Sequence, residues 1–371
     1  MRKKLSLLIA AVLCLCLCVG AFAAPGTADD PLISRDYLNG SYLAELNTQI
    51  NAKLDASDAA LLDAARAEWS RVLAKAEVSA LAKTRADFAE MRLKRGDILS
   101  GLTGLQVIPI AGELTVSFDS GAVVDVTAGE EVASGSVLVP GHRYLVAEDT
   151  LALVQVSSKT ALFNYCGSYH FTYSATPDYT AMAGALKSLN LFKGSDYAFG
   201  SGYELEVVPT RIQALIMLIR LLGEESAALA CTSEQPFNDV PDWCAPYVAY
   251  AYEKGYSNGV GGGQFGTTME SNAAQYTEFI LRALGYSSTA TTEINDAPER
   301  ALSHGVITAG ECASLKDGSF LRADVVYLSY YALGAHRASG EVLSTQLMRM
   351  NVFNHEQYRL AQKSVTSERI A

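Results

Sequence analysis

Two arginines, Arg211 and Arg322, stand where an apolar helical stretch begins, a position that suits binding of an anionic group. An arginine in the first turn of a helix lies beside unpaired backbone amides and the positive end of the helix dipole, and its guanidinium can bind a carboxylate through two hydrogen bonds. We therefore expect both to contact an acidic ligand. The alternative is a surface ion pair with a nearby carboxylate, worth about 0 to 1 kcal/mol of stability.

The two arginines belong to openings of four residues that recur in three segments. These openings are Thr210-Arg211-Ile212-Gln213, Asn272-Ala273-Ala274-Gln275 and Leu321-Arg322-Ala323-Asp324. Thirteen residues after the start of each comes a glycine that can end a helix in the left-handed conformation, namely Gly223, Gly285 and Gly334. Thr210 and Gln213 are the residue types that form a capping box at a helix start. Asn272 can also cap a helix, whereas the side chain of Leu321 has no hydrogen-bond acceptor.

A shorter helical stretch and a loop with a second glycine precede each opening. The stretches are Ala183 to Leu189, Tyr247 to Lys254 and Pro298 to His304, and the glycines are Gly194, Gly259 and Gly310. The repeated unit is therefore helix, glycine loop, helix. His304 falls in a last turn, where a partly charged imidazole suits the helix dipole.

These segments together resemble the S-layer homology family of bacterial cell-surface proteins. The middle one has Phe237-Asn238-Asp239-Val240-Pro241 with Trp243, and the openings at 210–213 and 321–324 look like the family's Thr-Arg-Ala-Glu signature. The resemblance covers the region 176–335, with repeats at about 179–233, 237–287 and 292–335. It implies an all-α domain of three repeats about a pseudo-threefold axis.

The resemblance also implies a function, because the family binds secondary cell-wall polysaccharide attached to peptidoglycan, often pyruvylated, in grooves between repeats. It implies that the signature arginines, Arg211 and Arg322, contact this sugar, and the further candidates for ligand binding are Thr210, Gln213, Asp324, Trp243, Asp239 and Gln275. Ala273 stands where the signature has arginine, so we expect one weakened groove and two competent grooves at most. Trp243 is expected to be a packing anchor rather than a sugar platform, and Asp239 to brace a helix start.

The first residues predict export. Arg2, Lys3 and Lys4 precede an apolar run that ends at Ala21-Phe22-Ala23-Ala24, which is the pattern of a signal peptide over residues 1–24. No later stretch is apolar for long enough to cross a bilayer. The formal net charge of -11 disfavours nucleic acid and anionic membranes as partners. We expect a secreted protein associated with the cell wall or S-layer.

The remaining regions complete a multidomain α+β architecture. Residues 25–95 are predicted to be helical, as a hairpin or coiled-coil-like segment that Ser57 divides in two. Residues 96–175 alternate short β-rich runs with turns, which indicates a small barrel or sandwich. Residues 336–371 form a tail, predicted to be partly helical, that has apolar residues enough to dock.

We expect neither an active site nor a metal or cofactor. Cys166 and His170 have the types of a nucleophile and a base, but no orienting carboxylate accompanies them. Gly261 to Gly266 fits a dinucleotide-binding pattern, yet a helix rather than a strand precedes it. Cys231 and Cys244 are free thiols or a disulfide. Two alternatives stay open: a wall-anchored enzyme with its active site in 96–175, and a self-assembling surface-layer protein.

Overall fold

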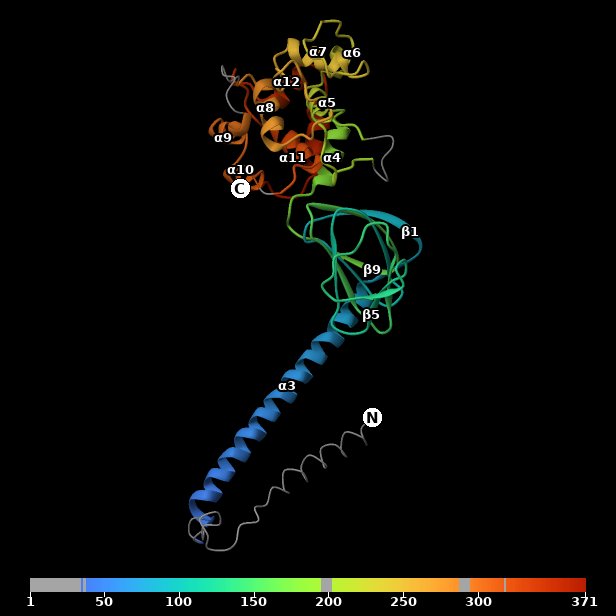
Figure 1. Cartoon of the computed structure of the whole chain (residues 1–371), viewed down its shortest axis with the longest axis vertical. Coiled ribbons are helices and arrows are strands. Elements are labelled where there is room, and N and C mark those ends of the chain that lie inside the picture. Colours follow the sequence, from blue (N-terminus) through green and yellow to red (C-terminus); the bar gives the residue numbers. More distant parts are fainter. Residues whose placement is uncertain (1–34, 36–37, 195–201, 287–293, 317) are drawn as a thin grey trace. The chain divides into compact units, whose positions relative to one another are not determined.

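The computed structural model describes residues 35, 38–194, 202–286, 294–316 and 318–371 (Figure 1). The predicted signal peptide lies outside these residues. The chain divides into two compact units, residues 1–73 and 74–371, and the boundary falls within one long helix. No helix in the described ranges has the length and apolar character that a membrane crossing requires.

The first unit holds most of that helix. A π-helical turn, η1 (Leu38–Tyr42), leads into α3 (Leu43–Leu81), which runs for 39 residues and buries none of them. The predicted break at Ser57 is wrong, because the surrounding alanine-rich sequence has a high helix propensity that continues through it. The predicted extension of the helix to residue 95 is also wrong. Residues Lys83–Lys94 form strand β1, which pairs along its length with β9.

The second unit begins with a curled antiparallel sheet. The described residues contain nine strands in this sheet: β1, β2 (Ile98–Gly101), β3 (Gln106–Ala111), β4 (Leu114–Ser117), β5 (Ala122–Asp125), β6 (Glu130–Val132), β7 (Tyr144–Ala147), β8 (Ala152–Val156) and β9 (Thr160–Thr172). Their order is β4-β8-β2-β9-β3-β7-β5-β6, with β1 added on β9. Residues 135–138 return to β4 through backbone hydrogen bonds. The sheet is thus a half-barrel around one apolar core.

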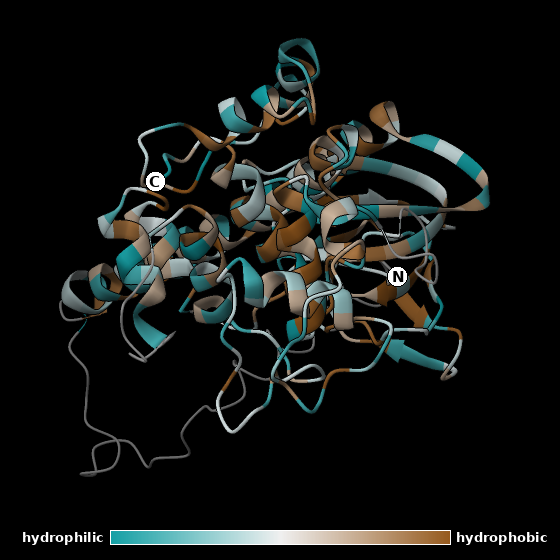
Figure 2. Cartoon of the chain, turned by 90° about the horizontal axis from the view of Figure 1, so that it is seen from above, coloured by the Kyte–Doolittle hydropathy of each residue, from teal (hydrophilic) through white to brown (hydrophobic). Residues whose placement is uncertain are grey.

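The rest of the second unit is helical. Its helices are α4 (Tyr179–Ser188), α5 (Arg211–Leu221), α6 (Glu225–Leu229), α7 (Ala245–Glu253), α8 (Ala273–Ala283), η2 (Ile294–Asp296), α9 (Ala297–Ser303), α10 (Ala309–Ser314), α11 (Arg322–Ala332), α12 (Leu343–Arg349) and α13 (His355–Lys363). They share a single core, and Figure 2 shows apolar, brown helical segments inside this group. The helices α5, α8 and α11 each contact the other two.

A buried ion pair joins the sheet to the helices. Arg92 of β1 lies 2.8 Å from Glu206, and both side chains are only 4% exposed. Thr160, at the start of β9, also donates to the Glu206 carboxylate at 2.8 Å. Removing one partner of a buried pair leaves an uncompensated charge, which costs about 3 to 5 kcal/mol. The sheet and the helical region therefore hold a fixed contact here.

We predict that Gly167→Ala destabilises the protein more than Gly104→Ala. Both glycines have positive φ values, +100° and +94°, so alanine is strained at either. A Cβ at Gly167 would also lie 2.3 Å from the carbonyl oxygen of Gly104, whereas a Cβ at Gly104 meets open space. Chemical denaturation should give a loss of about 1 kcal/mol for Gly104→Ala and clearly more for Gly167→Ala. Equal losses would contradict the close approach of these two segments.

Candidate binding site at the helix entrances

The N-terminal ends of α5, α8 and α11 are joined by backbone hydrogen bonds. Segment 205–211, which leads into α5, lies between the other two helix entrances. On one side, the Arg211 amide donates to Met269 at 2.7 Å and the Ser271 amide donates to Pro209 at 2.8 Å. On the other side, the Arg322 amide donates to Val207 at 2.9 Å. The three predicted openings therefore meet in one place.

Arg211 lies in the interior, with 2% of its surface exposed. Its Nε donates to the carbonyl of Phe265 at 2.9 Å, and its Nη2 donates to Ser257 Oγ at 3.0 Å. The guanidinium stacks against the rings of Phe265 and Phe279, at 5.2 and 4.8 Å from their centroids. Burial, and to a lesser extent the charge of Arg282, lowers the pKa of Arg211 to about 10.

Arg322 is also buried, at 6% exposure, and donates from Nε to the Tyr203 carbonyl at 3.2 Å. Burial lowers its pKa. Neither Arg322 nor Arg211 forms an ion pair among the described residues. The expectation that both guanidinium groups are presented to a ligand is wrong, because the loop of a neighbouring segment folds over each one. A carbonyl and, for Arg211, two aromatic rings take the place of a bound anion.

The third entrance is open. At α8, Ala273 lines a cavity of about 490 Å³. The opposite walls come from η2, α9 and the segment before α11, and they include Asn295, Glu299, Lys316 and Phe320. The small side chain of Ala273 leaves room that an arginine would fill, and the weakening of this groove stays a prediction. Each entrance faces a neighbouring segment: α5 faces the loop before α8, α8 faces the segment before α11, and α11 faces the segment before α5.

Several buried polar atoms in and near α8 have no hydrogen-bond partner among the described residues. They include Ser271 Oγ, Gln275 Oε1, Thr277 Oγ1 and Arg211 Nη1. A buried polar atom without a partner costs about 1 to 3 kcal/mol, so each calls for an explanation. Arg211 and Gln275 flank a cavity of about 10 Å³, which has space for a single water molecule at most. Ser271 is a lining residue of the large cavity, but its Oγ is buried like the other atoms.

The charges around the large cavity favour a neutral polar ligand. Lys316 and Glu299 pair at 2.8 Å, and this contact raises the pKa of Lys316 and lowers that of Glu299. Glu270 contributes a further negative charge. The balance is thus negative, which opposes a carboxylate or phosphate. Sequence reasoning missed Ser271 and Lys316, because only the fold brings them to the alanine of α8.

The other predicted ligand residues hold the local structure. Thr210 and Gln213 form the reciprocal capping box of α5, with Thr210 Oγ1 accepting at 3.4 Å and Gln213 Oε1 accepting at 3.0 Å. Asn272 caps α8 by accepting from the Gln275 amide at 2.9 Å. Asp324 accepts from the Leu321 amide at 2.8 Å and pairs with Lys159.

Asp239 braces the loop that covers Arg211. Its carboxylate accepts hydrogen bonds from the amides of Phe265 and Gly266, both at 2.7 Å, and of Thr267 at 3.3 Å. Burial acts to raise the pKa of Asp239, but these amides outweigh it and hold the pKa below 3.8. Gly261 to Gly266 belong to this loop between α7 and α8, with no strand before them.

Trp243 is 63% exposed, so the expectation that it anchors a helix by packing is wrong. It precedes α7 and does not line the large cavity. His304 ends α9 and stacks on Tyr286, with ring centroids 4.3 Å apart.

The described cysteines are free thiols, so Cys231 and Cys244 form no disulfide. Cys166 is buried, and burial raises the pKa of its thiol. A raised pKa disfavours the thiolate that nucleophilic attack requires. No hydrogen bond links Cys166 to His170 within the described part of the chain. Among the same residues, no group of three or more His, Cys, Asp or Glu side chains is placed to hold a metal ion.

Comparison with known proteins gives a partial relative. No model of a known protein family matches the chain. It is 35% identical over 112 residues to a protein of Thermoanaerobacter kivui named "Cell surface protein". The match covers 29% of this chain and 14% of the relative, so the chain spans a small part of that protein's length. Among solved structures, recombinant pro-11S globulin of pumpkin aligns over 27% of this chain and 28% of its own. The identity is 11% and the TM-score is 0.16, which is too low to indicate a shared fold.

We predict that Asp239→Asn destabilises the protein at pH 7, because it removes the charge that accepts the hydrogen bonds of the loop amides. The loss should be only about 1 kcal/mol, because this carboxylate is partly exposed and solvent screens its charge. A carboxylate whose pKa is lowered by folding stabilises the protein above its unfolded pKa of 3.8. The difference between the two proteins should therefore shrink as the pH falls below 3.8. Denaturation at several pH values measures it, and the exposed Asp242→Asn is the control. A difference that does not change with pH would count against the amide contacts.

Proposed function

We propose that the protein binds cell-wall polysaccharide without catalysis and is held at the cell surface by this contact. In this proposal the three helix, loop and helix segments act as S-layer-homology-like repeats, and the polymer is the secondary polysaccharide attached to peptidoglycan. The relative named as a cell surface protein and the predicted signal peptide support an extracellular location.

The observation that carries the proposal is the open cavity at the entrance of α8. The corresponding places at α5 and α11 are filled by buried arginines, whereas Ala273 leaves about 490 Å³ open. A cavity of this size accepts one or two sugar rings. Sugar hydroxyl groups both donate and accept hydrogen bonds, so they suit the exposed side chains of Asn295 and Glu299 in this cavity. The ligand group in this cavity is therefore an uncharged part of the polymer.

We predict that Ala273→Arg weakens wall binding at least tenfold, because the long side chain fills the cavity. Ala309→Arg is the matched control, since Ala309 is likewise the first residue of a helix, α10, and is exposed. The measurement is co-sedimentation of the purified protein with cell-wall sacculi, with and without chemical removal of the secondary polymer. Wild-type protein should sediment only with intact sacculi.

Two results would contradict the proposal. Sedimentation that persists on stripped sacculi would mean that the secondary polymer is not the partner. Stronger binding by Ala273→Arg would mean that the cavity takes an acidic group, as the signature arginine of the family implies, and would refute the assignment of an uncharged ligand.

The exposed surface of α3 favours a second function, assembly with another copy of the chain. Leu62, Ala65, Trp69, Val72 and Ala76 follow spacings of three and four, and Trp69 is 64% exposed. Such spacing forms the seam of a coiled coil. A helix of this length that buries no residue gains stability when its apolar face is covered. We propose that this face pairs with the same face of a second chain.

We predict that Trp69→Glu converts a dimer of the full chain into a monomer, because a carboxylate cannot be buried in the seam without a partner. Ala67→Glu places the same charge on the opposite face of the helix and should leave the dimer intact. Sedimentation equilibrium gives the mass. A wild-type monomer at tens of micromolar concentration, or equal effects of the two variants, would refute pairing through this face.

A further inference from the structure

A second cavity, of about 350 Å³, is lined by two cationic side chains that the sequence did not single out. Arg95 comes from the turn between β1 and β2, and Lys159 from the turn between β8 and β9. Asp324 of α11 and Tyr179 of α4 lie on the opposite walls. Sheet and helices thus contribute jointly to this site.

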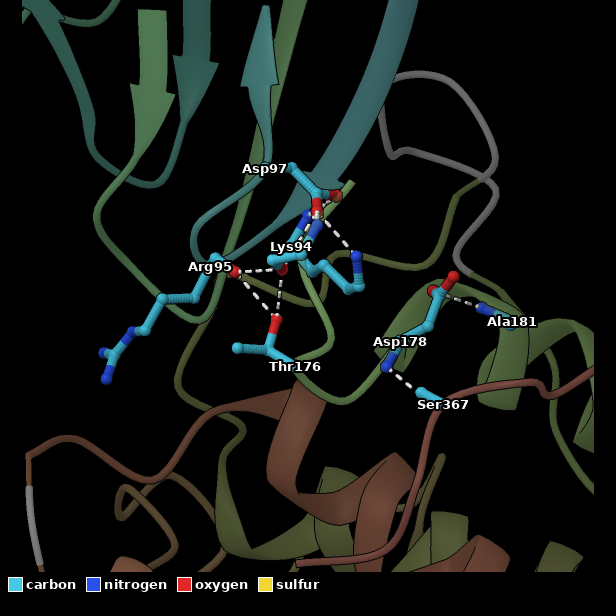
Figure 3. A network of polar contacts seen from close by, with 8 residues as sticks. Lys94, Arg95, Asp97, Thr176, Asp178, Ala181 and Ser367 are labelled. Carbon is cyan, nitrogen blue, oxygen red and sulfur yellow. Dashed lines mark hydrogen bonds and ion pairs between the residues drawn. The ribbon is translucent and has the colours of Figure 1, made fainter. Parts of the chain in front are cut away.

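The backbone of Arg95 is held while its side chain remains available. Ser174 Oγ and Thr176 Oγ1 both donate to the Arg95 carbonyl at 2.7 Å. The Arg95 guanidinium makes no hydrogen bond or ion pair with any residue that the structure describes. Figure 3 shows it extending away from the contacts between Lys94 and Asp97. Because its backbone is already held in place, Arg95 loses less conformational freedom when a ligand binds.

The charge of Arg95 is not compensated within the cavity. Lys159 Nζ lies 2.8 and 2.7 Å from the two carboxylate oxygens of Asp324 and 3.2 Å from the Ser319 carbonyl, so this pair is neutral as a whole. Burial raises the pKa of Asp324, although Lys159 opposes this shift. The positive charge of Arg95 remains.

Tyr179 adds a hydrogen-bond donor. Its ring is buried, and its hydroxyl has no hydrogen-bond partner in the described ranges. Burial raises the pKa of Tyr179, the charge of Asp324 raises it further and that of Arg95 lowers it, which places all three groups in one electrostatic environment. The hydroxyl therefore stays protonated and can donate to an oxyanion.

We propose that this cavity binds a carboxylate- or phosphate-bearing ligand of about the size of one sugar ring, with the Arg95 guanidinium and the Tyr179 hydroxyl as its donors. Guanidinium binds such oxyanions through paired, charge-assisted hydrogen bonds. In a chain with a formal net charge of -11, a local cation of this kind is what an anionic ligand requires. The same chemistry can come from an acidic sugar of a polymer or from a free anion.

The test is isothermal titration calorimetry of the full chain with inorganic phosphate, glucose 6-phosphate and glucose. Both phosphates should bind wild-type protein, and Arg95→Gln should weaken their binding about tenfold or more. Tyr179→Phe removes only the hydroxyl and should weaken binding several-fold. The control Arg359→Gln removes a cation that is paired with Glu356 on α13 and should change nothing. Thermal unfolding curves verify that the variants fold.

The probes also separate the two sources of the ligand. Tighter binding of glucose 6-phosphate than of phosphate indicates a sugar-linked anion, and equal binding indicates a free one. Binding of neither phosphate, or binding that Arg95→Gln leaves unchanged, would overturn the proposal. The site does not depend on wall binding through α8: sedimentation with sacculi and titration with phosphate can each fail while the other succeeds.

Discussion

The helical region depends on one connecting segment, residues 205–211, because this segment supplies backbone partners to two helix entrances and starts a third. A helix start leaves its first amides unpaired, and here several of these donors or their neighbours are satisfied by the carbonyls of Leu205, Val207 and Pro209. The same segment carries Glu206, which pairs with Arg92 of the sheet. The places where the helices begin are thus fixed by a few hydrogen bonds and one ion pair.

That constraint explains why related openings do different things. A side chain at the second position of an opening must project toward the loop of a neighbouring segment. Where the residue is Arg211, the loop closes on it, and Asp239 holds the closed form through backbone amides. Where the residue is Ala273, no side chain fills the space and the cavity remains. The signature residue and the open groove are therefore mutually exclusive in this structure.

The helix starts could be predicted from sequence because caps and glycine stops are local signals, and Thr210 and Gln213 behave as their types indicate. The burial of Arg211 could not, since it depends on a loop more than forty residues away in sequence. The prediction of helix over Lys83–Lys94 is wrong because these residues pair with β9, some 70 residues further on, and this pairing overrides local propensity. Arg95 and Lys159 belong to turns without any pattern, so only the fold reveals that they line one cavity.

The buried pair of Arg92 and Glu206 has a mechanical consequence. The sheet is joined to the helices by packed side chains as well as by covalent chain, and the acidic partner lies in the segment that organises the helix starts. A force that pulls on the sheet would therefore act on segment 205–211 through this ion pair, as well as through the covalent connection between β9 and α4. Pulling the two parts apart requires the separation of these two charges, and salt screens this pair only weakly because both side chains are buried.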